Sequence, residues 1–165
     1  MSTQMFDPQA FLDMPIDEAN VKRPPLMAGD YTSIIKDVVP EVWQSKDKYD
    51  EKTGQLKSGI KYNVIHTVEV PEAERNRVGI TGVTCVELKD TIMLEMNDSG
   101  GIDTAPGKNG ALRRYRDALD MNKPGVTFKP REMIGRPICV RLAHREYPAG
   151  SGDLFEEIKG VAKLA

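Results

Sequence analysis

The chain has 165 residues, of which 39% are hydrophobic and 29% charged, and its formal net charge is −2. This length fits one domain plus a tail. No apolar run approaches the roughly 20 residues that a membrane-spanning helix needs, and the N-terminus lacks the basic-then-apolar pattern of a signal peptide. These features argue against a membrane protein, and we expect a soluble protein that is not exported.

The charge is unevenly distributed along the chain. Residues 1–104 contain 11 basic and 18 acidic side chains, whereas residues 105–165 contain 12 basic and 7 acidic ones. A basic C-terminal part indicates either a polyanionic partner or packing against the acidic N-terminal part. The distribution of charge does not choose between these two interpretations.

Residues 1–28 are predicted to form an N-terminal arm outside a domain that spans residues 29–165. In the arm, apolar residues such as Phe11 and Leu12 are interleaved with acidic ones, and four prolines break any long helix. An acidic and apolar segment of this kind docks on a partner or on a neighbouring copy of the chain. Alternatively, it covers an open edge of its own domain, and both interpretations remain open.

Alternation of apolar and polar residues predicts strands over residues 31–43, 60–70 and 83–96. His66 and Ile65 are the two exceptions to the alternation of the second strand. The intervening residues 44–59 have no apolar periodicity and are predicted to form a mobile loop.

One helix is predicted over residues 109–121, because Leu112, Tyr115 and Leu119 recur at helical spacing. Residues 130–133 are predicted to add one further helical turn. A terminal hairpin is predicted over residues 135–161, where an alternating strand is followed by a turn rich in Gly and Pro and then by a second strand.

The resulting order is strand, strand, strand, helix, strand, strand. This is the order of an OB-fold, a small five-stranded Greek-key barrel with one helix between strands 3 and 4. A four-stranded sheet with one covering helix is the alternative. The residues expected in the core are Ile34, Val64, Leu94, Leu112, Leu119, Ile138, Val140 and Ile158.

Motifs for catalysis or metal binding are missing from the sequence. No Gly-rich phosphate loop ends in Lys-Ser or Lys-Thr, and no Gly-x-Ser-x-Gly occurs. His66 and His144 lie within strand patterns, and Cys85 and Cys139 have no metal-ligand spacing. We therefore expect no enzyme activity, no metal and no cofactor.

The sequence is more consistent with nucleic-acid binding than with catalysis. An OB-fold binds its ligand across strands 2 and 3, between the first and last hairpin loops. Single strands need a cationic track for phosphates and exposed aromatic faces for bases. Alternatively, Trp43 is a core residue, and the lysine-rich loop is a solvated one whose charges are balanced by acidic neighbours. The expected nucleic-acid-binding residues are Trp43, Lys46, Lys48, Tyr49, Lys52, Lys57, Lys61, Arg113, Arg114, Arg141, Arg145 and Tyr147.

Several turn, helix and hairpin motifs carry a family resemblance. They are Phe11-Leu12-Asp13 with the Pro-rich lead to Gly29-Asp30-Tyr31, residues 113–119 followed by Asn122-Lys123-Pro124-Gly125, Ile134-Gly135-Arg136, and Gly160-Val161-Ala162-Lys163. Together they span nearly the whole chain, which resembles a group of small bacteriophage proteins that we associate with single-stranded DNA-binding proteins of OB-fold type.

The resemblance implies sequence-independent binding of single-stranded DNA during phage replication or recombination, in the host cytoplasm. It also implies phage replication or recombination proteins as partners through the N-terminal arm. Many such proteins end in an acidic tail, whereas this chain ends in Lys163-Leu164-Ala165. The alternative function is a virion structural or capsid-decorating protein whose arm laces onto a neighbour. A homo-oligomer is one possible assembly, and the sequence does not determine the oligomeric state.

Overall fold

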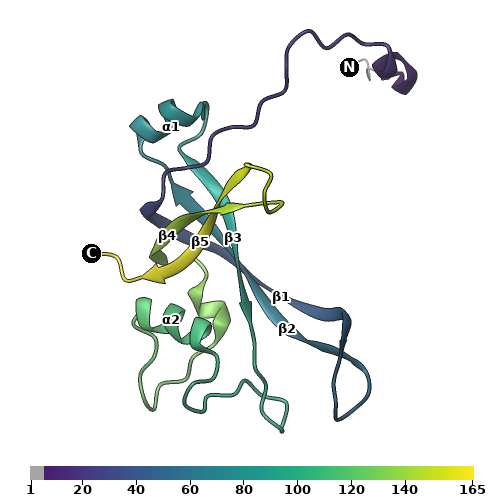
Figure 1. Cartoon of the computed structure of the whole chain (residues 1–165). Helices are drawn as coiled ribbons and strands as arrows, with labels where there is room; N and C mark the ends of the chain where they lie inside the picture. The colour runs from purple at the N-terminus through teal and green to yellow at the C-terminus, as the bar shows by residue number, and fades with distance from the viewer. Residues whose placement is uncertain (1–5) are drawn as a thin grey trace.

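The computed structural model describes residues 6–165 and is mainly β, with an open five-stranded antiparallel sheet and two α-helices (Figure 1). The strands lie side by side in the order β3-β2-β1-β4-β5. The elements are η1 (Pro8–Leu12), β1 (Gly29–Tyr49), β2 (Leu56–Glu69), α1 (Glu72–Val78), β3 (Cys85–Met93), α2 (Gly110–Ala118), η2 (Pro130–Met133), β4 (Pro137–Glu146) and β5 (Leu154–Ala162).

The strand predictions are confirmed except near the first turn. Residues 44–59 were expected to form a loop, but β1 continues to Tyr49 and β2 begins at Leu56, so only residues 50–55 form the turn. The prediction failed because this part of the hairpin lies beyond the core, where neither face needs apolar residues. β1 is paired with β4 only up to Ile34, so further along the strand only β2 pairs with it.

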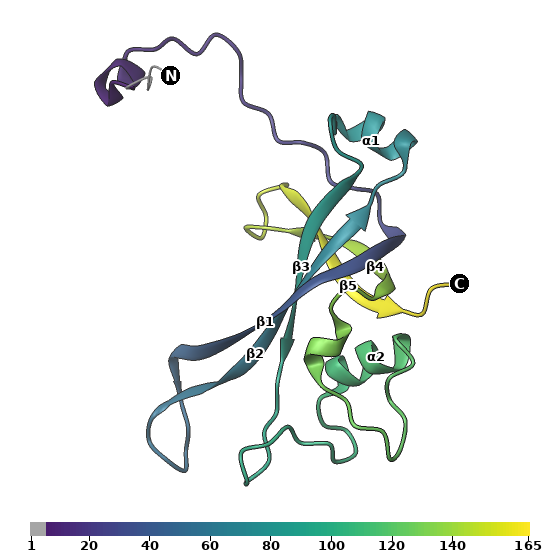
Figure 2. The ribbon, with the colours of Figure 1, turned by 180° about the vertical axis from the view of Figure 1, so that it is seen from behind.

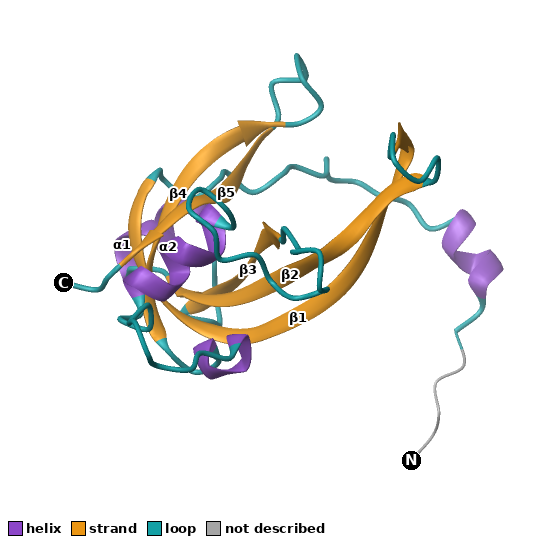
Figure 3. Ribbon diagram, turned by 90° about the horizontal axis from the view of Figure 1, so that it is seen from below, coloured by secondary structure: helices purple, strands orange, loops and turns teal. Residues whose placement is uncertain are grey.

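Two hairpins project from the sheet on the same side, both pointing away from α2 (Figures 1 and 3). The first is the β1–β2 tip, which we define as residues 43–59. The second is the β4–β5 loop, residues 147–153. Viewed from behind, the tip again extends past the lower part of β3, with α2 on the opposite side (Figure 2).

The helix predicted over residues 109–121 is confirmed as α2, and the predicted turn at residues 130–133 is η2. The side chain of Asn109, just before α2, bonds both the N–H and the C=O of Glu95, which ties the long loop after β3 to the helix. The sequence prediction missed α1. This short helix has acidic residues in its first turn, basic residues in its last, and Gly79 at φ +79° as its C-cap.

The core includes residues of α2 and η2 and extends to Leu26, before β1, and Val78, of α1. Of the expected core residues, Val64, Leu94, Leu112, Ile138 and Val140 are buried, and Leu119 and Ile158 are partly buried against them. The expectation for Ile34 was wrong, since this side chain is 50% exposed. Its neighbours Ser33 and Ile35 are buried, and successive side chains of a strand point to opposite faces.

A chain of polar side chains crosses this core. The Tyr115 hydroxyl donates to Asp90 Oδ2 at 2.7 Å, so it accepts from His66 Nε2 at 2.8 Å, and His66 Nδ1 lies 3.0 Å from Ser33 Oγ. Burial lowers the pKa of His66 to about 4, so the imidazole is neutral. Because Ser33 and His66 are fully buried, these hydrogen-bonded side chains join β1, β2, α2 and β3 and do not offer a reactive hydroxyl to solvent.

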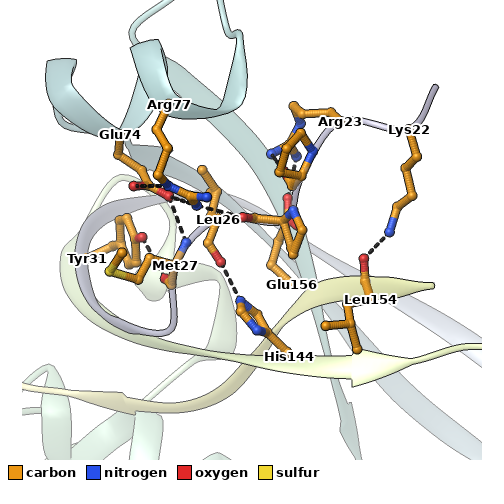
Figure 4. A network of polar contacts seen from close by, with 12 residues as sticks. Lys22, Arg23, Leu26, Met27, Tyr31, Glu74, Arg77, His144, Leu154 and Glu156 are labelled. Atoms are coloured by element: carbon orange, nitrogen blue, oxygen red, sulfur yellow. Dashed lines mark hydrogen bonds and ion pairs between the residues drawn. The ribbon is translucent and has the colours of Figure 1, made fainter. Parts of the chain in front are cut away.

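The N-terminal arm divides into two parts. Residues 22–28, the anchor, lie on the domain, where Leu26 is completely buried and its carbonyl is 2.7 Å from His144 Nε2 (Figure 4). Lys22 and Arg23 bond Leu154 and Glu156 of β5. Residues 6–21, the free arm, are exposed throughout and extend away from the sheet (Figure 1). Residues 1–5 lie outside the described residues.

None of the helices in residues 6–165 has the length and apolar character to cross a membrane.

Candidate nucleic-acid interface

The β1–β2 tip is held by its own turn and cross-strand pairs. Asp50 closes the turn: its N–H donates to the Gln55 carbonyl at 2.7 Å, and its Oδ1 accepts from the Lys52 N–H at 2.8 Å. One of the tip's three carboxylates is therefore used by the backbone of the turn. Four lysines expected to bind nucleic acid lie in the tip, namely Lys46, Lys48, Lys52 and Lys57.

These four lysines form no ion pair with any carboxylate of residues 6–165. Lysines elsewhere are of both kinds: Lys36 Nζ lies 2.7 Å from Glu87 and Lys123 Nζ lies 3.2 Å from Asp120, whereas others such as Lys159 form no ion pair with a described residue. A cation without a protein partner gives up no ion pair when it meets a phosphate. Because four such lysines lie close together in the tip, it is a candidate cationic surface, although its three acidic residues lower its net charge.

Two tyrosines stand exposed on the two projecting hairpins. Tyr49 ends β1 and is 62% exposed, and Tyr147 begins the β4–β5 loop and is 61% exposed. The guanidinium of Arg145 lies 5.4 Å from the centroid of the Tyr147 ring. Both rings therefore offer aromatic surface to solvent, and Tyr147 does so beside a cation.

Trp43 is neither a core residue nor a free ring. It is half-buried and lies against Gly59 of the paired strand, where an added Cβ would come within 2.9 Å of the indole Nε1. That Nε1 is buried and bonds no other group of the described chain. This contact with the backbone of β2 covers part of the indole and so reduces the surface on which a base could stack.

Two of the expected residues are committed to ion pairs on the sheet. Arg141 Nε donates to Asp30 Oδ1 at 2.9 Å, and this bond holds the pKa of the Asp30 carboxyl below its usual range. Lys61 Nζ lies 3.8 Å from Glu41, whose other oxygen bonds Asn63. Each must share its charge with a carboxylate, so each is a weaker candidate for phosphate binding.

Arg113 and Arg114 lie on α2, on the other side of the molecule from both hairpins (Figures 1 and 3). The structure therefore groups the four tip lysines, Tyr49, Arg145 and Tyr147 on one side of the sheet. It leaves the two helix arginines apart from that group.

Phe155 is an aromatic residue that the sequence analysis did not select. It lies opposite Arg145 across the β4–β5 pair, is 44% exposed, and has Lys22 Nζ 3.4 Å from its ring centroid. The available signal was strand alternation, since Phe155 and Ile158 are an odd number of residues apart in β5 and therefore point to opposite faces. The contribution of Lys22 could not be found, because it depends on how the anchor crosses β5.

No group of three or more His, Cys, Asp or Glu side chains in residues 6–165 is placed to hold a metal ion. Cys85 and Cys139 are partly buried free thiols, and burial raises the pKa of Cys139.

Comparisons with known proteins add no family to this description. No protein-family model matches the chain, and a search of curated proteins found no significant match.

Proposed function

We propose that this chain is a sequence-independent single-stranded DNA-binding protein of OB type that acts in phage replication or recombination. The observation that carries the proposal is that two hairpins project on the same side of the sheet. One hairpin has four lysines without a carboxylate partner among residues 6–165, and both have an exposed tyrosine.

The strand order supports the OB part of the proposal. An OB-fold is a five-stranded, partly open barrel, and a five-stranded sheet closes into a barrel when its two edge strands come together. Here the open sheet has the order β3-β2-β1-β4-β5, and β3 and β5 have Cα atoms within 8 Å of each other. No ladder of paired residues joins them in the described chain. Helix α2 contacts both β3 and β5, as expected of a helix that follows the third strand.

The side chains support binding without sequence preference. Lysine is a point charge that contacts phosphates of any strand, and each phosphate contact releases counterions. A tyrosine ring stacks on any base, at about 1–3 kcal/mol per base. Neither group reads the edges of the bases, so binding follows the backbone and the stacking surface alone.

The test is a titration of the full chain with labelled single-stranded and duplex oligonucleotides, at low and at high salt. The proposal predicts binding to single strands that weakens with salt, and clearly weaker binding to duplexes. A set of single-stranded sequences of one length should bind alike, apart from a modest preference set by stacking. Absence of binding to single strands at low salt, where phosphate contacts are strongest, contradicts the proposal.

The second candidate function is a virion accessory protein. The observation that favours it is the free arm, whose apolar side chains cover no part of their own domain. An arm of this kind could lace onto a neighbouring capsid subunit. Mass spectrometry of purified particles separates the two functions, because a replication protein is left behind in the infected cell and a capsid component is retained in the particle.

A further inference from the structure

The free arm, residues 6–21, is an exposed segment that combines apolar and acidic side chains. Six apolar side chains are between 54% and 87% exposed, namely Phe6, Phe11, Leu12, Met14, Ile16 and Val21. Residues 6–21 also contain four carboxylates and no basic residue. Asp7 caps the short helix η1 by accepting from the Gln9 N–H at 3.0 Å. A segment that exposes this much apolar surface has the character of a docking motif.

The anchor directs the free arm away from its own domain. Met27 N–H donates to Glu74 of α1 at 2.7 Å, and Arg77 of the same helix donates to the Pro25 carbonyl at 2.9 Å (Figure 4). With Arg23 also bonded to Glu156 of β5, the chain is fixed on both sides where it leaves the sheet. The free arm then runs to the end of the molecule opposite α2 (Figures 1 and 2).

A cavity of about 440 Å³ beside α2 is also lined partly by apolar residues, but most of its charged residues are basic. We call it the α2 pocket. Its apolar wall includes Ile102, Leu112 and Phe128, and its basic wall includes Lys108, Arg113 and Arg116. Asp103 is the one carboxylate in the lining.

Two of the basic side chains of the α2 pocket have little or no ion pairing within the chain. Arg116 forms no ion pair with a described residue: its guanidinium lies 4.7 Å from the Phe128 ring centroid, one Nη donates weakly to the Met121 carbonyl at 3.4 Å, and its buried Nε bonds no group of residues 6–165. Arg113 is exposed and forms no ion pair in the described chain. Lys108 is paired with Glu95 at 3.6 Å. The pocket thus offers apolar surface together with two cations that have capacity for a carboxylate.

We propose that the free arm of one copy binds the α2 pocket of a second copy. Phe11 and Leu12 supply the apolar side chains for the pocket, and Asp13 and Asp17 supply the carboxylates for Arg113 and Arg116. The choice of a second copy as occupant follows from this match in charge and polarity between two surfaces of one chain. It is independent of the proposed DNA binding.

The positions of the two surfaces determine the kind of assembly. Each copy has one arm and one pocket at opposite ends, so the contact is head-to-tail. Such contacts produce rings when the rotation closes and open chains when it does not. An open chain of copies would also make binding along a DNA strand cooperative.

The experiment measures self-association of the full chain by sedimentation velocity over a range of concentrations, without nucleic acid. The wild type should form oligomers beyond a dimer, and high salt should weaken them. Replacing Phe11 and Leu12 with Ala should lower the association constant about tenfold or more, because anchors of an interface carry most of its energy. These residues are exposed, so the folded domain is not disturbed.

A matched pair of arginines tests the pocket. Arg113→Glu should weaken association as strongly as the arm variant, whereas Arg114→Glu should leave it nearly unchanged. The two residues are adjacent on α2 and exposed, but only Arg113 lines the pocket. Equal effects of the two changes would overturn the assignment of the pocket.

A charge exchange completes the test. Asp13→Lys with Asp17→Lys should abolish association, and combining these changes with Arg113→Glu in one chain should restore part of it. A wild type that stays monomeric at all concentrations overturns the proposal and leaves the arm to a different protein. An association constant that the Phe11 and Leu12 changes leave at the wild-type value also overturns it. Neither result bears on DNA binding, which is measured separately.

Discussion

The two ends of β1 differ in how their charges are used. At the sheet end, Lys36 is paired with Glu87 and Asp30 with Arg141, while Ser33 and Ile35 are buried between them. At the tip end, the lysines of residues 43–59 have no carboxylate partner in the described chain, and no side chain is buried. One continuous strand thus has an end that stabilises the fold and an end available for a ligand.

The largest difference between the two ends should appear in stability. Ile35→Ala removes a fully buried side chain and should lower the free energy of unfolding by about 2–5 kcal/mol. Val42→Ala, in the same strand, changes a side chain that is 75% exposed and should cost about 0.5 kcal/mol or less. Urea unfolding of both variants measures the difference. Similar losses would mean that the tip end is part of the folding core.

The buried polar chain at the sheet end should make stability depend on pH. Folded His66 has a pKa near 4, whereas the unfolded imidazole takes up a proton below about pH 6.5. Stability is therefore fully present above about pH 6.5 and is lost as the pH falls toward 4, by at most about 3 kcal/mol. Burial raises the pKa of Asp90, and its protonation in the folded state offsets part of this loss at the lower end.

The control for this effect is His66→Gln. The variant should be less stable than the wild type at neutral pH, because it changes a fully buried group, but its stability should vary less between about pH 6.5 and about pH 4.5. Thermal melts across that range give both curves. If the variant keeps the wild-type pH dependence, another group is responsible and the account of the buried chain is wrong.

The exposed tyrosines should affect binding without affecting stability. Tyr49→Ala and Tyr147→Ala should each weaken single-strand binding by about 1–3 kcal/mol, because each removes one stacking surface. The slope of affinity against salt should stay nearly the same, since stacking releases no ions. Tyr→Phe at the same positions keeps the ring and should keep the affinity. An equal loss with Phe would show that the hydroxyl, rather than the ring, makes the contact.

Much of the fold could be predicted because its core obeys simple periodicities. The alternation of β2 and β4 and the helical spacing of Leu112, Tyr115 and Leu119 all report burial on one face. Ile34 was misjudged because two adjacent isoleucines leave the parity of the strand open. The α1 helix was missed because seven residues with little apolar content give no stripe, although Pro71 and Gly79 mark its ends.

Less of the candidate site could be predicted, because ion pairing between distant residues has no local signature. Lys61 and Lys57 look alike in the sequence, yet only Lys61 lies beside Glu41 of the neighbouring strand. The pairing of Asp30 with Arg141 joins residues far apart in the chain and depends on the β1–β4 register. Trp43 likewise packs on Gly59 only because the two residues are directly opposite each other.

The most direct test of the central claim compares two sets of three lysines by the salt dependence of single-strand binding. One variant changes Lys46, Lys48 and Lys52 of the tip to Ala. The other changes Lys36, Lys61 and Lys123, which are ion-paired in the structure, and so removes the same formal charge.

If the tip lysines contact phosphates, the log–log salt slope of the tip variant falls by about 2 units, at about 0.7 for each phosphate that a lysine no longer neutralises. The account predicts a slope close to that of the wild type for the paired set. Equal reductions of the salt slope in the two variants, or a larger reduction in the paired set, would contradict the claim that the unpaired lysines of the tip bind single-stranded DNA.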